Sequence, residues 1–244
     1  MRNVSIIGLG LIGGSIAKRL KHCGSLKSEC RDLKLAVEEK VVDRLFESWD
    51  ELIEWSDLII LATPLSTLSQ LAEEIARHAK KPILVIDVSS VKKAVMPTFE
   101  AKTNEMIEFI STHPMAGKET WGFASSDASL FEGCTWVISP HKKNRQSSID
   151  AVTHLIDSLG AQPLLLDPEE HDRQAALVSH LPALISRELL KFVEKTNPGS
   201  LKLAGPGFRS MTRLAHDNPQ LQSEIASFNQ EFIAEFMRQF KEIL

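Results

Sequence analysis

The sequence predicts an α/β protein: a doubly wound parallel sheet followed by an all-helical domain. Two observations carry this prediction. Short apolar runs alternate with segments of helical periodicity as far as Leu166, and no strand-like run follows Asp167. Alternating strands and helices are typical of a parallel sheet that is covered by helices on both faces. We therefore expect one domain over residues 1–167 and a second over residues 168–244.

The expected strands are short apolar runs bounded by turn residues. They cover residues 3–8, 58–62, 83–88, 107–111, 136–138 and 163–166. The expected helices have apolar residues three or four positions apart. They cover residues 11–22, 33–42, 50–55, 65–77, 93–101 and 149–159 in the first domain, and 171–194 and 219–243 in the second. Between Gly24 and Asp32, where a second strand is expected, almost nothing is apolar.

The composition is that of an ordinary globular protein and argues against several kinds of partner. The formal net charge is −4, and no part of the chain concentrates basic residues. We therefore expect neither a nucleic acid nor a membrane as a partner. The three cysteines, Cys23, Cys30 and Cys134, lack the spacing of metal ligands. We expect them to be reduced thiols in a cytoplasmic protein without a bound metal.

The motif G-L-G-L-I-G-G begins at Gly8, between an expected strand and an expected helix. In that context it is the fingerprint of a Rossmann-type dinucleotide-binding domain. Gly8 permits a tight turn, Gly10 lets the backbone approach a pyrophosphate, and Gly13 lets helix and strand pack closely. Leu11 and Ile12 open the helix, whose free N–H groups favour phosphate. We therefore expect NAD or NADP as the cofactor.

The sequence leaves the choice between NAD and NADP open. Asp32 lies about 20 residues after the motif, where an acidic side chain binds the 2′-hydroxyl of NAD, and Glu29 is close by. Arg31 and Lys27 are equally placed to meet the 2′-phosphate of NADP. Ordinary solvated loop charges are the alternative for all four side chains.

Polar side chains follow several of the expected strands. Ser90 lies within D-V-S-S-V-K after one strand, His113 follows the next, and Thr63 and Pro64 end an earlier one. Because open α/β sheets bind ligands at the carboxyl ends of their strands, we expect these residues near the cofactor. A neutral imidazole at His113 is suited to accept a proton from a substrate hydroxyl while a hydride departs. Taken alone, S-S-V-K is more typical of a helix cap than of a reactive site. A single histidine, taken alone, is more typical of a structural contact.

Two of the arginines and two of the histidines in the second domain are worth considering as functional residues. Arg209 and Arg213 are four residues apart, so they share a face if this segment is helical. Two arginines beside the loop A-G-P-G-F are suited to bind a carboxylate, and a solvated helix face is the open alternative. His171, between two acidic residues, is expected to be ion-paired or to cap a helix. His180 lies in an apolar helix and is expected to be buried and hydrogen-bonded.

Together these motifs resemble the prephenate/arogenate (cyclohexadienyl) dehydrogenase family of tyrosine biosynthesis. The resemblance covers nearly the whole chain and keeps the motifs in order. They read G-L-G-L-I-G-G-S, D-V-S-S-V-K, H-P-M-A-G, L-F-E-G, D-P-E-E-H-D, S-H-L-P and G-F-R-S-M-T-R. Several motifs in the family's order are far more specific than any one of them.

The resemblance implies an NAD(P)-dependent oxidative decarboxylation of arogenate or prephenate. His113 stands at the position of the family's catalytic histidine, which takes the proton from the C4 hydroxyl. Ser90 matches the serine that hydrogen-bonds the same hydroxyl or the histidine. Arg213 matches the arginine that binds a substrate carboxylate, and Arg209 takes a neighbouring basic position. The resemblance also implies a homodimer formed through the C-terminal helices.

Three departures from the family pattern bear on substrate and cofactor. Many members that use prephenate read S-H-L-P-H, whereas the last position here is Ala183, which favours arogenate. Lys118 stands where the family usually has threonine after H-P-M-A-G, and we expect it to add a contact to an anionic substrate. The region after Gly24 is shortened where the adenosine side binds. A non-catalytic dinucleotide-binding protein and another Rossmann small-acid dehydrogenase are the alternatives.

Overall fold

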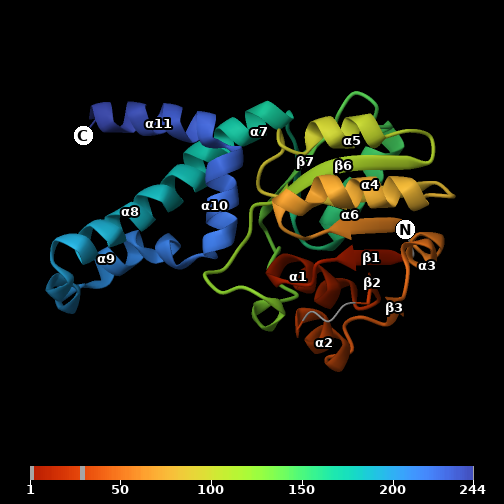
Figure 1. Cartoon of the computed structure of the whole chain (residues 1–244), viewed down its shortest axis with the longest axis horizontal. Helices are drawn as coiled ribbons and strands as arrows, with labels where there is room; N and C mark the ends of the chain where they lie inside the picture. Colours follow the sequence, from red (N-terminus) through yellow and green to blue (C-terminus); the bar gives the residue numbers. More distant parts are fainter. Residues whose placement is uncertain (1–2, 28–30, 244) are drawn as a thin grey trace. The chain divides into compact units, whose positions relative to one another are not determined.

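The structure is a computed structural model that describes residues 3–27 and 31–243 of the chain. The chain divides into two units, Met1–His171 and Asp172–Leu244. All strands of the described residues belong to the first unit, and the second is helical (Figure 1). Glu29 and Cys30 lie outside the described residues. Among the residues that are described, no helix combines the length and the apolarity that a membrane span requires.

The described part of the first unit contains an eight-stranded sheet with the strand order β3-β2-β1-β4-β5-β6-β7-β8. The strands are β1 Val4–Ile7, β2 Gly24–Leu26, β3 Arg44–Phe46, β4 Leu58–Leu61, β5 Ile83–Asp87, β6 Ile107–Pro114, β7 Thr135–Ser139 and β8 Gln162–Leu165. The order reverses between β1 and β4, so the carboxyl ends of these two strands form the switch point where doubly wound sheets bind ligands.

The doubly wound sheet is confirmed, with one departure at β7. This strand is antiparallel to β6, with His113 opposite Val137, whereas the other paired strands that the structure describes are parallel. The connection from β6 to β7 has a single 3-10 turn, Phe123–Ser125, and no crossover helix. An antiparallel neighbour needs no such crossover. Alternating sequence patterns do not report strand direction.

A short second strand does form after residue 23. β2 pairs with β1 and with β3, a strand that the sequence pattern did not predict. A Cβ at Gly24 would lie 2.5 Å from the Phe46 ring and 3.0 Å from that of Trp55, so the two rings fill the space beside a residue without a side chain. The hydroxyl of Ser25 donates to the carbonyl of Ile6 at 2.8 Å. β2 is therefore buried by side chains of other segments, and its own residues are not apolar enough to reveal it in the sequence.

Helices cover both faces of the sheet. One face carries α1 Leu11–Leu20, α2 Arg31–Glu38 and α6 Gln146–Ser158, whose apolar side chains share one core with β1, β4 and β7. The remaining helices of this unit before residue 168 are α3 Trp49–Trp55, α4 Leu68–His78 and α5 Met96–Lys102. On α5, Phe99 stacks on Phe109 of β6 with ring centroids 5.0 Å apart. These helices hold the central strands in an apolar layer.

The helices from residue 168 onward include two long ones that pack on a small apolar core. The helices are α7 Pro168–Ala175, a π-turn Ala176–His180, α8 Leu181–Thr196, α9 Pro206–Met211, α10 Pro219–Phe228 and α11 Gln230–Ile243. Leu181, Phe232 and Phe236 are buried in this core. The helix expected over residues 219–243 is interrupted at Asn229, whose side chain donates to the carbonyl of Asp172 at 2.8 Å.

Candidate active site

The glycine-rich loop follows β1 and is shaped by close backbone contacts. Gly8 has a φ of +93°, and a Cβ there would overlap the carbonyl of Ala62. A Cβ at Gly13 would overlap the carbonyl of Gly8. Side chains are therefore excluded at both positions, because β1, the end of β4 and α1 meet there.

Gly10 has the opposite environment. A Cβ built on it meets nothing within 4 Å, and it caps α1 without a side-chain hydrogen bond. The helix begins at Leu11. Leu11 and Ile12 are both half-buried. An open backbone next to a helix N-terminus is suited to a pyrophosphate, since the first-turn N–H groups lack helical partners. The geometry of this chain therefore fits a dinucleotide.

Thr63 and Pro64 follow β4, the strand beside β1. The methyl group of Thr63 lies 2.9 Å from the position that a Gly8 Cβ would occupy, so Thr63 borders the glycine-rich loop directly. Its hydroxyl is 2.8 Å from that of Thr67. Pro64 is exposed. Both residues lie at the switch point of the sheet.

Asp32 and Arg31 lie at the start of α2 rather than at the end of β2. The Asp32 carboxylate accepts the N–H of Phe123 at 3.0 Å, which ties the segment after β6 to α2. Arg31 is exposed. Contacts of either residue with a ribose or a 2′-phosphate stay a prediction.

A buried polar network lies at the carboxyl ends of β5 and β6. Asp87 and Lys92 are fully buried and 2.9 Å apart. The Asp87 carboxylate also accepts hydrogen bonds from Ser89, from Ser111 at 2.6 Å and from the N–H of Thr112 at 3.2 Å. Lys92 donates to the carbonyl of Thr112 at 2.5 Å. The network thus binds both the N–H and the carbonyl of Thr112, the residue before His113.

Ser90 is half-buried and directly follows the network residue Ser89. Asp87 pairs with Ser111 in the parallel register of β5 and β6. His113 is two residues beyond Ser111, and Ser90 three beyond Asp87, so the structure brings both candidate residues to the same edge of the sheet.

His113 is 8% exposed and makes a contact that sequence reasoning missed. Its Nδ1 lies 2.9 Å from Nε2 of His171, which is 2% exposed and lies on α7. The interpretation of His171 as an ion-paired or capping residue omitted this contact. The two residues are 58 positions apart in the sequence, and no local pattern links them.

Lys118 lies in the segment that follows β6. Its ammonium group is 3.1 Å from the Asp127 carboxylate and 3.3 Å from the carbonyl of Ser125. Hydrogen bonds from the N–H and hydroxyl of Ser129, followed by that from Lys118, lower the pKa of Asp127 to about 2. Asp127 is therefore ionised at neutral pH and holds the lysine. A contact of Lys118 with substrate stays a prediction.

Arg209 and Arg213 are both exposed and lie in two different short helices of the second unit. Arg209 is on α9, which ends at Met211, and Arg213 opens a 3-10 turn, Arg213–His216. Thr212 between them has φ −98° and ψ 8°. They do not share one α-helical face, because the α-helix ends before Arg213.

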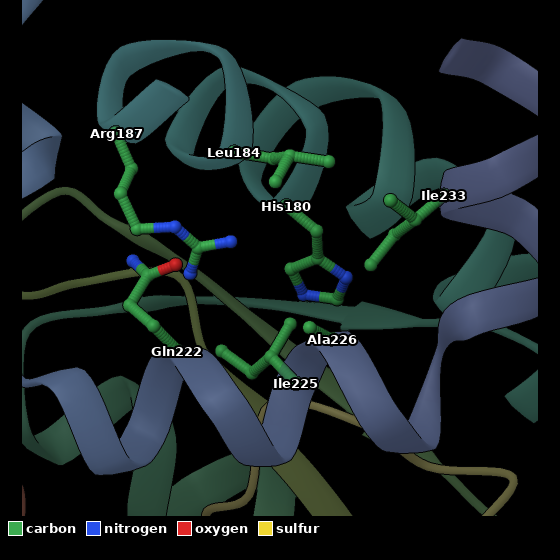
Figure 2. Close-up of a pocket in the computed structure, with 7 residues that line it drawn as sticks. All are labelled: His180, Leu184, Arg187, Gln222, Ile225, Ala226 and Ile233. Carbon is green, nitrogen blue, oxygen red and sulfur yellow. The ribbon is translucent and has the colours of Figure 1, made fainter. Parts of the chain in front are cut away.

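His180 is buried and hydrogen-bonded, as expected. Its Nδ1 lies 2.9 Å from the side-chain amide of Asn229. Figure 2 shows its ring directed between α8 and α10, beside Ile225 and Ala226. Ala183, three residues later on α8, is also buried. Among the described residues, no group of three or more His, Cys, Asp or Glu side chains is arranged to hold a metal ion.

Comparison with known proteins identifies both parts of the chain. The family model for the nucleotide-binding domain of prephenate dehydrogenase matches residues 19–165, and that for its dimerization domain matches residues 167–244. The chain is 30% identical to the prephenate dehydrogenase of Lactococcus lactis subsp. cremoris, over 100% of this chain and 70% of the relative. It is 28% identical to that of Bacillus subtilis, over 94% of this chain and 65% of the relative.

Solved structures agree with this assignment. Prephenate dehydrogenase from Aquifex aeolicus, in complex with hydroxyphenyl propionate and NAD+, has a TM-score of 0.90 and 27% identity, covering 99% of this chain and 87% of that one. Synechocystis arogenate dehydrogenase has a TM-score of 0.82 and 26% identity, covering 98% and 88%. The chain therefore belongs to the prephenate dehydrogenase family, a family of oxidoreductases.

Proposed function

We propose that this chain catalyses the NAD(P)-dependent oxidative decarboxylation of arogenate or prephenate in tyrosine biosynthesis. One observation carries the proposal: His113 and Ser90 lie at the same sheet edge as an open glycine-rich loop. A dinucleotide site and a candidate base at one edge are what hydride transfer from a hydroxylated substrate requires. The family membership given above supports the same reaction.

The cofactor site in this proposal is formed by the loop after β1. Gly10 and the first-turn N–H groups of Leu11 and Ile12 would hold the pyrophosphate. Thr63 and Pro64 would border it on the β4 side. The nicotinamide of bound NAD or NADP would supply the acceptor for a hydride.

His113 is the proposed general base. Its imidazole would take the proton of the substrate's C4 hydroxyl as the C4 hydride leaves with its electron pair, for which a bound nicotinamide would be the acceptor. The ring carboxylate then departs as CO2, and the electron pair of the broken C–C bond completes the aromatic ring. Ser90 is proposed to hydrogen-bond the same hydroxyl and so to orient it. The product is then a phenolate, and the proton from its oxygen remains on His113.

Three basic side chains are proposed to bind the substrate's carboxylates. Arg213 and Arg209 present guanidinium groups, which match a carboxylate with two parallel hydrogen bonds. Lys118 already binds the Asp127 carboxylate at 3.1 Å, and its ammonium group has three N–H donors, so a substrate carboxylate would share the lysine with Asp127 or replace it. We favour arogenate over prephenate, because buried Ala183 offers no hydrogen-bond donor at its position.

We also propose a homodimer that forms through the C-terminal helices. The match to a dimerization domain supports it, and large apolar side chains of this unit are exposed, among them Phe192 at 65%. A cytoplasmic location is proposed from the cysteines, since Cys23 and Cys134 are free thiols.

The test is NADH or NADPH absorbance after mixing the purified chain with each substrate and each dinucleotide. Turnover in any of the four combinations supports the proposed reaction, and the relative rates identify substrate and cofactor. Tight NAD(P) binding without turnover in all four, by a folded protein, contradicts it. That result would favour a non-catalytic dinucleotide-binding protein.

A further inference from the structure

Two buried histidines of the first unit share one hydrogen bond. Nδ1 of His113 and Nε2 of His171 are 2.9 Å apart, and the rings meet edge to face with centroids 5.1 Å apart. His113 belongs to β6 and His171 to α7. When both rings are neutral, a single hydrogen lies between these two nitrogens, so one ring donates and the other accepts.

The direction of this hydrogen bond decides what His113 can do. If His171 donates, the proton of neutral His113 is on Nε2, and that nitrogen has no lone pair to offer a substrate. If His113 donates, its proton is on Nδ1, and Nε2 is a base. A neutral histidine without a partner favours the Nε2–H form, so a base at Nε2 needs an acceptor at Nδ1.

We propose that His171 is that acceptor, a positioning residue that keeps neutral His113 in its Nδ1–H form. This inference rests on the proposed role of His113 as the general base. When Nε2 takes the substrate's proton, the Nδ1–H bond to His171 becomes charge-assisted and stronger. In this role His171 carries its own hydrogen on Nδ1, leaves Nε2 of His113 able to accept the substrate's proton, and stabilises the imidazolium that results.

Both rings are attached to backbone that is itself held in place. The carboxylate of Asp167 accepts the N–H groups of Glu169 at 2.9 Å and Glu170 at 3.3 Å, which caps α7. The N–H of His171 donates to the carbonyl of Asp167 at 2.8 Å. On β6, Asp87 and Lys92 bind the N–H and the carbonyl of Thr112, which fixes the backbone directly before His113. The motif D-P-E-E-H-D thus has a function in aiming His171.

The direct test is the ring 15N spectrum of the full chain with labelled histidine, recorded where His113 is neutral. The chain has eight histidines, and His113→Asn identifies the signal. We expect a protonated Nδ1 and an unprotonated Nε2. The opposite tautomer in the wild type overturns the inference, whatever the activity. An Nδ1–H tautomer in a protein without turnover would instead contradict the proposed function alone.

Kinetics of three variants give a second test. We expect His171→Leu, which has no acceptor, to lower kcat by roughly 10- to 100-fold with little change in either KM. His171→Gln places an amide oxygen near the former Nε2 and should recover most of kcat. His154→Leu, on the exposed face of α6, is the control and should match wild type. An unchanged kcat in His171→Leu, or equal losses in the Leu and Gln variants, overturns the inference.

Discussion

The ammonium nitrogen of Lys92 lies 2.9 Å from the carboxylate of Asp87, and both side chains are fully buried. Lys92 also donates to the hydroxyl of Ser89 at 3.0 Å and to the carbonyl of Thr112, which gives each ammonium proton an acceptor. A buried ion pair adds little stability over apolar packing. We infer that this pair serves chiefly to position the peptides that carry Ser90 and His113.

Removing one partner of this pair should destabilise the fold. Lys92→Met leaves the Asp87 charge buried without its cation, and we expect the free energy of unfolding to fall by about 3–5 kcal/mol. Urea unfolding measures this change. Lys80→Met, at an exposed pair with Asp50, is the control and should leave the midpoint near that of wild type. A wild-type midpoint for Lys92→Met would contradict the account of the network.

Substitutions at two glycines of the loop should affect different properties: one the stability of the fold, the other the affinity for the dinucleotide. Gly8→Ala puts a Cβ against the Ala62 carbonyl at a φ of +93°, so we expect a loss of more than about 2 kcal/mol in stability. Gly10→Ala meets open space at a φ of −73° and should change stability by less than about 1 kcal/mol. It should weaken dinucleotide binding by about tenfold or more. Unfolding curves and fluorescence titration with NADH and NADPH measure both effects. Unchanged binding by Gly10→Ala would contradict the placement of the pyrophosphate.

Arg213→Ala should mainly raise KM for the substrate. A guanidinium that grips a carboxylate in both the ground state and the transition state contributes uniform binding, whose loss leaves kcat almost unchanged. Steady-state kinetics with the active substrate measure both constants. Lys202→Ala, another exposed cation of the same unit, is the control. A fall in kcat at constant KM would contradict the proposed role.

Glu108 should make stability depend on pH. Burial raises the pKa of its carboxyl, but hydrogen bonds from Ser148 and from the backbone and side chain of Arg145 outweigh burial, so the pKa is below its ordinary value. The stabilisation is therefore present above the unfolded pKa of about 4.3 and is lost as pH falls below it. We expect Glu108→Gln to cost about 1.5–3 kcal/mol at pH 7. The difference from wild type should stay constant above about pH 4.3 and shrink as the pH falls below it in urea titrations. A difference that stays constant below that pH would refute this explanation.

Much of the first unit could be predicted because its central strands are covered on both faces. Buried parallel strands have continuous apolar sequences, and Leu58–Leu61 is one that is fully buried. The glycines at positions 8 and 13 were predicted because only glycine fits where two backbones touch. Such features depend on the residues themselves and on their immediate neighbours, so the sequence reports them.

Other features depend on contacts between distant segments. β2 contains Gly24 and Ser25, and its burial comes from the Phe46 and Trp55 rings, so hydrophobic periodicity did not reveal it. The pairing of His113 with His171 likewise depends on how α7 approaches β6. The break at Asn229 replaces a continuous helix because its side-chain amide bonds two groups outside that helix.

The proposed base can be tested most directly by comparing kcat of His113→Asn with that of wild type on the active substrate. Asparagine keeps a polar group near the former Nδ1, so the contact with His171 is conserved while Nε2 is lost. We expect kcat to fall by roughly 10²- to 10⁴-fold, with dinucleotide affinity unchanged. A wild-type kcat in His113→Asn would contradict the assignment of His113 as the general base.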